Sequence, residues 1–127
     1  MSRQVINVPF APKYPFSPGI RAGDFIFVSG QGGFVDDDGS EIRGIEAQTR
    51  KCLENIKRIL LTAGATMEDV VKCTIFLGDV ANFTVMNNIY KEYFPKEFPA
   101  RSTAITGLAV PSMLVEIECI AYSPAKK

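Results

Sequence analysis

The chain of 127 residues carries 14 Lys and Arg against 14 Asp and Glu, so its formal net charge is zero, and 46% of its residues are hydrophobic. This balance is typical of a globular protein, and the length suits one domain, which we expect to span residues 1–127. Because neither sign of charge is in excess, the composition gives no electrostatic argument for binding to nucleic acid or to an anionic membrane.

The residue types that are missing restrict the chemistry further. The chain contains no histidine, which excludes Ser–His and Cys–His nucleophile pairs and every histidine-containing metal site. Its three cysteines, Cys52, Cys73 and Cys119, are too few for an all-cysteine zinc site. They lie far apart in apolar patterns, so we expect buried free thiols in a reducing compartment.

The sequence also lacks signals for secretion or membrane insertion. The first residues, MSRQVINVPF, contain no apolar run of signal-peptide length. No stretch approaches the ~18 apolar residues that a membrane-spanning helix needs. We therefore expect a soluble, cytoplasmic protein.

The first 40 residues predict strands around one proline-rich loop. Residues 4–8 form a possible short strand, and PKYPFSPG, residues 12–19, predicts a loop because it contains three prolines. Residues 24–29, DFIFVS, are rich in β-forming types, and the glycine-rich residues 30–33 should end that strand. DDDGS, residues 36–40, predicts a turn.

Two helices are predicted next, with a strand between them. Apolar residues recur at three- and four-residue steps over residues 45–63, and Gly64 fits a C-terminal cap. Residues 70–77, VVKCTIFL, predict a strand. A second helix is expected from Asp79 to Phe94, where Pro95 follows, with the apolar stripe Phe83, Met86, Tyr90 and Phe94.

Two further strands are expected at residues 101–106 and 114–122. Because helices lie between strands and strands also follow one another at both ends, the order predicts an α+β domain: a mixed sheet with two helices packed on one face. In the last strand, one face is small and apolar, whereas the other alternates aliphatic and acidic residues: Leu114, Glu116, Glu118 and Ile120. Such a mixed face indicates partial burial by another subunit.

The stretch FPARSTAITGL, residues 98–108, places Arg101 near the start of a strand. An arginine beside small and β-branched residues is either a solvated charge at a sheet edge or a group placed to bind an anion. The residues of this stretch alone leave both interpretations open.

Several motifs together resemble the Rid family of reactive intermediate deaminases, the YjgF-type proteins. They are PFSPGIRAGDFIFVSGQ, AQTRKCLENI, VVKCTIFLGDVANF, MNNIYKEYF and, most specifically, FPARST followed by LVEIECIA, and they cover nearly the whole chain. The resemblance implies a chorismate-mutase-like fold and a homotrimer whose sheets form a central barrel. It also implies active sites in the clefts between subunits.

The activity that this resemblance implies is hydrolysis of 2-aminoacrylate or 2-iminobutanoate to the 2-keto acid and ammonia, without a metal or an organic cofactor. Arg101 would bind the substrate carboxylate through its planar guanidinium. Glu116 would hold the attacking water. The same resemblance assigns five residues to substrate binding: Phe16, Ser29, Gly30, Asn87 and Thr103.

The chain departs from the family pattern at three places. Phe16 stands where many members have tyrosine, so a hydroxyl is missing there, and Thr103 stands where deaminating members often have cysteine. Gly32–Gly33 replace an Ile–Pro pair that is common in the family. These differences leave the substrate open.

Two other functions stay open as alternatives. The same trimer would serve as a binding module that holds a small carboxylate without turnover. A ribonuclease or chaperone role has less support, because no basic stripe with interleaved aromatic residues is present. We expect a small imine or enamine acid as the ligand, and neither nucleic acid nor a membrane as a partner.

Overall fold

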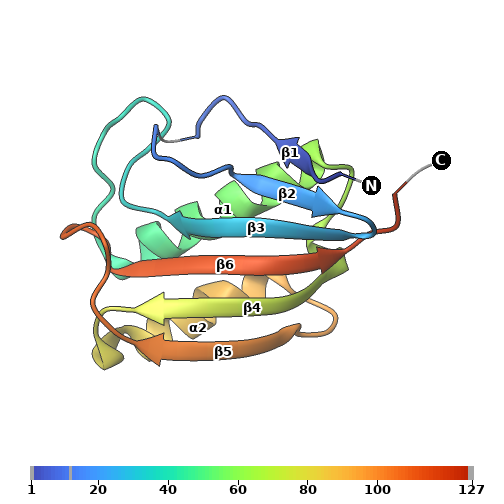
Figure 1. The fold of residues 1–127 in the computed structure, drawn as a ribbon. Helices are drawn as coiled ribbons and strands as arrows, with labels where there is room; N and C mark the ends of the chain where they lie inside the picture. The colour runs from blue at the N-terminus through green and yellow to red at the C-terminus, as the bar shows by residue number, and fades with distance from the viewer. Residues whose placement is uncertain (1, 12, 126–127) are drawn as a thin grey trace.

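The computed structural model describes residues 2–11 and 13–125, which form a six-stranded sheet with two helices on one face (Figure 1). The strand order is β1-β2-β3-β6-β4-β5, and all neighbours are antiparallel except the parallel pair β4 and β5. This architecture confirms the predicted α+β fold. The elements are β1 (Gln4–Ile6), β2 (Gly19–Ala22), β3 (Phe25–Gly32), α1 (Ile45–Thr62), β4 (Val70–Leu77), α2 (Phe83–Tyr90), β5 (Ala100–Ile105) and β6 (Val115–Tyr122).

Helix α1 lies against the sheet because its apolar residues share one side. Leu53, Ile56 and Ile59 are buried in the core between the helix and strands β3 and β6. The helix ends at Thr62, and Gly64 follows the C-cap residue Ala63 with a φ of 85°, a conformation that glycine adopts without strain, so the predicted glycine cap is present. In the described part of the chain, neither this helix nor any other is long and apolar enough to cross a membrane.

Strand β6 lies at the centre of the sheet and shows the predicted alternation. Its helix-facing residues are buried, whereas Glu116 is half-buried and Glu118 is exposed on the opposite face. The predicted free, buried thiols are also found, since all three cysteines belong to the core. No helix of the described residues covers the opposite face (Figure 1), which exposes large apolar side chains: Val5, Phe25, Phe27 and Tyr122.

Strand β2 was not predicted, and the loop expected at residues 12–19 is therefore shorter. Pro12 lies outside the described residues, and Gly19 already belongs to β2. A two-residue turn, Gly23–Asp24, joins β2 to β3, with φ of 61° at Gly23. A Gly–Asp pair between two β-forming segments is the signal that would have predicted this hairpin.

Two other expected boundaries were wrong. Strand β3 does not end at Gly30 but continues to Gly32, because a β-bulge between Val28 and Gln31 keeps it paired with β6. The helix expected at residues 79–94 is α2 alone, flanked by short 3₁₀ turns at Val80–Asn82 and Lys91–Tyr93. The Asp79 side chain accepts a hydrogen bond from the backbone of Ala81 and fixes the first of these turns.

Candidate active site

Arg101 lies on the edge strand β5, and its side chain turns toward α2. It is paired with Cys73, which faces the helices, so both side chains lie on that side of the sheet. Its Nε donates to Oγ1 of Thr103 at 3.0 Å, and its Nη2 donates to Oδ1 of Asn87 at 2.7 Å. The structure thus brings together three of the residues expected at the site.

Among the described residues, neutral groups alone hold the Arg101 guanidinium. Its central carbon lies 4.9 Å from the ring centre of Tyr90, a cation–π distance. Within the described ranges, Arg101 forms no ion pair, whereas Arg50 and Arg58 each bind a carboxylate. Two of its five N–H donors are used, and Nη1 donates to no described residue. A planar donor edge with its full charge is therefore available to an incoming anion.

A cavity of ≈330 Å³ opens beside this guanidinium. It is lined by Asn87, Tyr90, Lys91, Phe98, Pro99 and Arg101. Sequence reasoning treated Tyr90 as a packing residue, and the ring is indeed buried, yet its face also supports the arginine. The spacing of Tyr90 from Asn87 is the sequence signal for this contact with Arg101. The two residues are three positions apart on α2, and residues at that spacing share one face of a helix.

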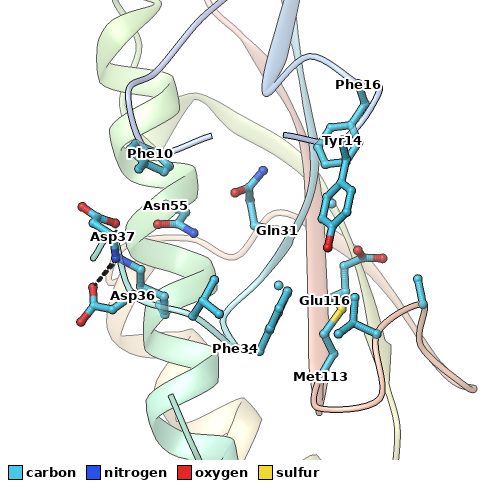
Figure 2. Close-up of a pocket in the computed structure, with 16 residues that line it drawn as sticks. Phe10, Tyr14, Phe16, Gln31, Phe34, Asp36, Asp37, Asn55, Met113 and Glu116 are labelled. Carbon is cyan, nitrogen blue, oxygen red and sulfur yellow. Dashed lines mark hydrogen bonds and ion pairs between the residues drawn. The ribbon is translucent and has the colours of Figure 1, made fainter. Parts of the chain in front are cut away.

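Glu116 lies on β6 and lines a separate, larger cavity of ≈410 Å³. Phe16 and Gly30, both expected at the site, line the same cavity (Figure 2). Burial and, to a smaller extent, the negative charge of Glu118 raise the pKa of Glu116 above its usual value. Such a shift makes this carboxylate a stronger base than an exposed one once it is ionised.

The bulge in β3 explains why Gly30 is a glycine. A Cβ at this position would lie 2.8 Å from Cδ of Glu116, closer than carbon atoms approach each other. The extra residue of the bulge thus brings bare backbone against the carboxylate. Any side chain at Gly30 would displace Glu116.

Ser29, also expected at the site, forms hydrogen bonds to the loop before β2. Its hydroxyl donates to the carbonyl of Ser17, and its backbone N–H donates to the carbonyl of Pro18 at 3.0 Å. Ser29 therefore anchors the loop that carries Phe16 and is not among the residues that line the cavity. Tyr14, on the same loop, does line the cavity and was missed, because nothing in its local sequence marks it.

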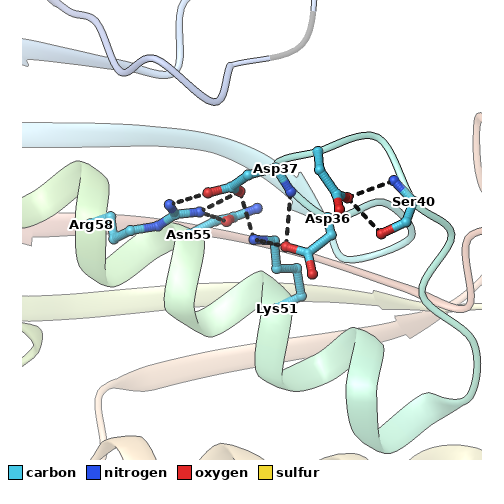
Figure 3. A network of polar contacts seen from close by, with 7 residues as sticks. Asp36, Asp37, Ser40, Lys51, Asn55 and Arg58 are labelled. Atoms are coloured by element: carbon cyan, nitrogen blue, oxygen red, sulfur yellow. Dashed lines mark hydrogen bonds and ion pairs between the residues drawn. The ribbon is translucent and has the colours of Figure 1, made fainter.

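A network of charges, shown in Figure 3, contributes Asp36, Asp37 and Lys51 to the lining of the larger cavity. The predicted turn at residues 36–40 is present, with the backbone N–H of Asp36 donating to the carbonyl of Ser40 at 2.8 Å. Asp37 accepts hydrogen bonds from Arg58 and Lys51 on α1, and these donors hold its pKa well below the usual value. The network fixes the turn to the helix.

We call Arg101, Asn87 and Thr103 the cationic cluster, and Glu116 with Phe16 and Gly30 the acidic cluster. Arg101 and Glu116 lie on opposite faces of the sheet. Arg101 shares its face with Cys73 and Cys119, whereas Glu116 pairs with Phe76 on the other face. Strand β4 lies between their strands, so two strand spacings and three residues along the strand separate them, which places their Cα atoms on the order of 14 Å apart. One chain therefore does not bring both groups to the same small molecule.

The chemistry that these clusters offer is anion binding and proton transfer. The thiols are unsuited to nucleophilic attack, because burial raises the pKa of Cys52 and of Cys119. No group of three His, Cys, Asp or Glu side chains suited to a metal ion occurs in residues 2–11 and 13–125. The groups available for chemistry are therefore the Arg101 guanidinium, which has unused donors, and the Glu116 carboxylate, which lies beside a cavity.

Fold and clusters together define an α+β protein with an arginine on an edge strand and a glutamate on the central strand. The family model described as Endoribonuclease L-PSP matches residues 6–123. The chain therefore belongs to this family, which confirms the Rid-type resemblance seen in the sequence.

Individual relatives agree with this assignment. A RutC family protein of Pyrococcus abyssi is 42% identical, over 96% of this chain and 98% of its own length. Reactive Intermediate Deaminase A, chloroplastic, of Arabidopsis thaliana is 38% identical, over 95% of this chain and 66% of its own length. The crystal structure of YyfA from Yersinia pestis, a Rid-family protein of unknown function, has a TM-score of 0.88 and 39% identity, covering 95% of this chain and 99% of that one.

Proposed function

We propose that this protein hydrolyses short-lived 2-imino and 2-enamino acids, such as 2-iminobutanoate and 2-aminoacrylate, to the 2-keto acid and ammonia. The observation that carries the proposal is the Arg101 guanidinium, which neutral side chains hold with its charge unpaired among the described residues. Such a group suits a small planar carboxylate. The name of the Arabidopsis relative, a reactive intermediate deaminase, supports the same class of reaction.

Water is the only co-reactant that this hydrolysis requires. The Glu116 carboxylate accepts a proton from water as the water oxygen bonds to the imine carbon, and the C=N π electrons move to nitrogen. Glu116 returns this proton to the nitrogen, which gives a neutral carbinolamine. The carbinolamine hydroxyl then gives its proton to the nitrogen by way of Glu116, the C–N bond breaks, ammonia leaves and the carbonyl of the keto acid forms. An enamine substrate first becomes the imine when a proton moves from its nitrogen to its CH2 carbon. Because an imine carbon is already electrophilic, a positioned carboxylate of raised pKa is sufficient as the base.

The opposite placement of the two clusters leads us to propose a site between subunits. Arg101 of one protomer would meet Glu116 of another across a cleft in a homotrimer. The apolar side chains exposed on the helix-free face support such an assembly, because contiguous exposed apolar surface is typical of an interface. In this arrangement the helix-free faces would line the central barrel.

The compartment follows from the thiols as part of the same proposal. Three buried cysteines without a disulfide suit a reducing environment such as the cytoplasm.

A coupled assay tests the activity. A threonine or serine dehydratase would generate the imine acid in place, and the formation of keto acid would be followed with and without this protein. Formation faster than the spontaneous rate is the expected result. A folded protein that gives no acceleration but binds 2-ketobutyrate in calorimetry would instead indicate the carboxylate-binding module.

Light scattering in solution tests the assembly separately. The proposal expects the mass of three chains, and a stable monomer that is fully active would refute the site between subunits.

A further inference from the structure

We propose that Tyr14 is a positioning residue of the acidic cluster: its phenol hydroxyl orients the Glu116 carboxylate and the water that this carboxylate holds. The inference rests on the proposed function, because it concerns how that site is organised. It adds a residue to which neither the sequence motifs nor the expected site assigns a role.

A tight turn fixes Tyr14 beside Phe16. The backbone N–H of Phe16 donates to the carbonyl of Tyr14 at 2.8 Å, which closes a three-residue turn around Pro15. The φ that proline imposes lies close to the value that the centre of an inverse γ-turn requires. The two rings are stacked, with centroids 6.2 Å apart and planes 22° apart. Tyr14 is thus held by its backbone turn and by the neighbouring ring.

Tyr14 and Glu116 face the same cavity. Both residues line it, and in the view of Figure 2 the Tyr14 ring extends from the loop with its oxygen on the side where the Glu116 carboxylate lies. The hydrogen bonds among the described residues include none between these two side chains, so a water between them would make the contact. The Tyr14 residue is 54% exposed, so burial in the core does not account for its orientation. A tyrosine hydroxyl in the same cavity as a carboxylate is suited to hydrogen-bond that carboxylate or a water bound to it.

Two of the other donor side chains around the cavity, Gln31 and Lys51, bind groups other than Glu116. Among the described residues that line it, Tyr14 alone carries a hydroxyl. The Nε2 of Gln31 donates to the carbonyl of Ser29 at 3.0 Å, and Lys51 binds Asp36 and Asp37. Asn55 lies on α1, where it accepts a hydrogen bond from Arg58, and in Figure 2 it stands away from Glu116. Tyr14 is therefore the side chain best placed to hydrogen-bond the carboxylate or its water.

This role makes a specific kinetic prediction. A hydroxyl that orients the base and its water acts mainly on the chemical step, whereas Arg101 would bind the substrate. A hydrogen bond to a charged group contributes enough that Tyr14→Phe should lower kcat roughly tenfold to a hundredfold, with KM little changed.

The experiment compares three variants in the coupled assay: Tyr14→Phe, Tyr14→Phe with Phe16→Tyr, and Tyr93→Phe. The second variant moves the hydroxyl to the stacked neighbouring ring and should recover part of the lost kcat. Tyr93→Phe is the matched control, since it removes a tyrosine hydroxyl that donates to Glu54 and lines neither of the two cavities, and it should keep the wild-type kcat. A merely structural role for Tyr14 would lower stability without this pattern of loss and recovery.

Three results would overturn the inference. Wild-type kcat in Tyr14→Phe refutes the role of Tyr14 and leaves the proposed function intact. If the double variant has the same low kcat as Tyr14→Phe, a hydroxyl on the stacked ring does not replace that of Tyr14. This result would refute the role of the hydroxyl in orienting Glu116. A wild-type protein that does not accelerate imine hydrolysis refutes the proposed function itself, and the role of Tyr14 with it.

Discussion

Replacement of Arg101 is the most direct test of how this protein would recognise its substrate. Arg101→Lys keeps the positive charge but replaces a planar fork by a single nitrogen. That nitrogen cannot contact Asn87, Thr103 and both oxygens of a carboxylate at once, although the guanidinium has donors for all of them. Arg101→Ala removes the charge as well.

The expected fall in kcat/KM depends on how many hydrogen bonds to the substrate carboxylate each variant loses. Arg101→Ala abolishes a bidentate, charge-assisted interaction, for which we expect a fall in kcat/KM on the order of a hundredfold or more. Arg101→Lys should keep about half of that interaction and so fall about tenfold. Because Arg101 donates only two hydrogen bonds to neutral groups at the sheet edge, either change should alter the unfolding free energy by about 1 kcal/mol.

The assay is the coupled formation of keto acid, with thermal unfolding and light scattering on the same samples. Arg43→Ala is the matched control, because the Arg43 side chain is 83% exposed and pairs only with Glu41 among the described residues. This control should keep the wild-type rate. An Arg101→Ala protein that is folded and assembled like the wild type, yet keeps the wild-type kcat/KM, would refute the reasoning.

Three further predictions concern the surroundings of these groups. Thr103→Val removes the acceptor that holds Nε of Arg101 and should raise KM several-fold, while an unchanged KM would show that Arg101 needs no such support. Gly30→Ala places a Cβ 2.8 Å from the Glu116 Cδ and should lower kcat in a protein that remains folded; a wild-type rate would contradict the close approach. The ionised form of Glu116 accepts the proton, so kcat/KM should rise with pH as the pH passes its raised pKa. In Glu118→Gln the neighbouring negative charge is lost, the pKa of Glu116 falls, and the acid limb of the pH–rate profile should move to lower pH; an unmoved limb would show that the charge of Glu118 does not act there.

Patterns within single segments gave reliable predictions of the fold. Helix α1 and strands β4 and β6 were predicted because their apolar residues repeat with periods that only one element fits. Strand β2 was missed because GIRA is short, and what makes it a strand is its pairing with β3 across the Gly23–Asp24 turn. Helix α2 was predicted too long, because apolar spacing does not distinguish a helix from the 3₁₀ turns that flank it.

The candidate site divides in the same way. Arg101 and Thr103 share a face because they are two residues apart on one strand, which the sequence predicts. That Asn87 reaches the same guanidinium depends on α2 packing behind β5. Tyr14 was missed because its position beside Glu116 depends on a loop that Ser29 anchors from another strand.

By itself, the sequence determined which side chains are available for chemistry. For each one on a strand, it also determined which other residues of that strand share its face. It excluded histidine chemistry, and it turned Glu116 away from the core residues of its strand, since alternation along a strand is a local property with a period of two. Only the tertiary structure decided that Arg101 faces the helices while Glu116 faces the open side of the sheet. The reason is physical: the register between strands far apart in the sequence is set by packing of the whole core, which no single segment encodes.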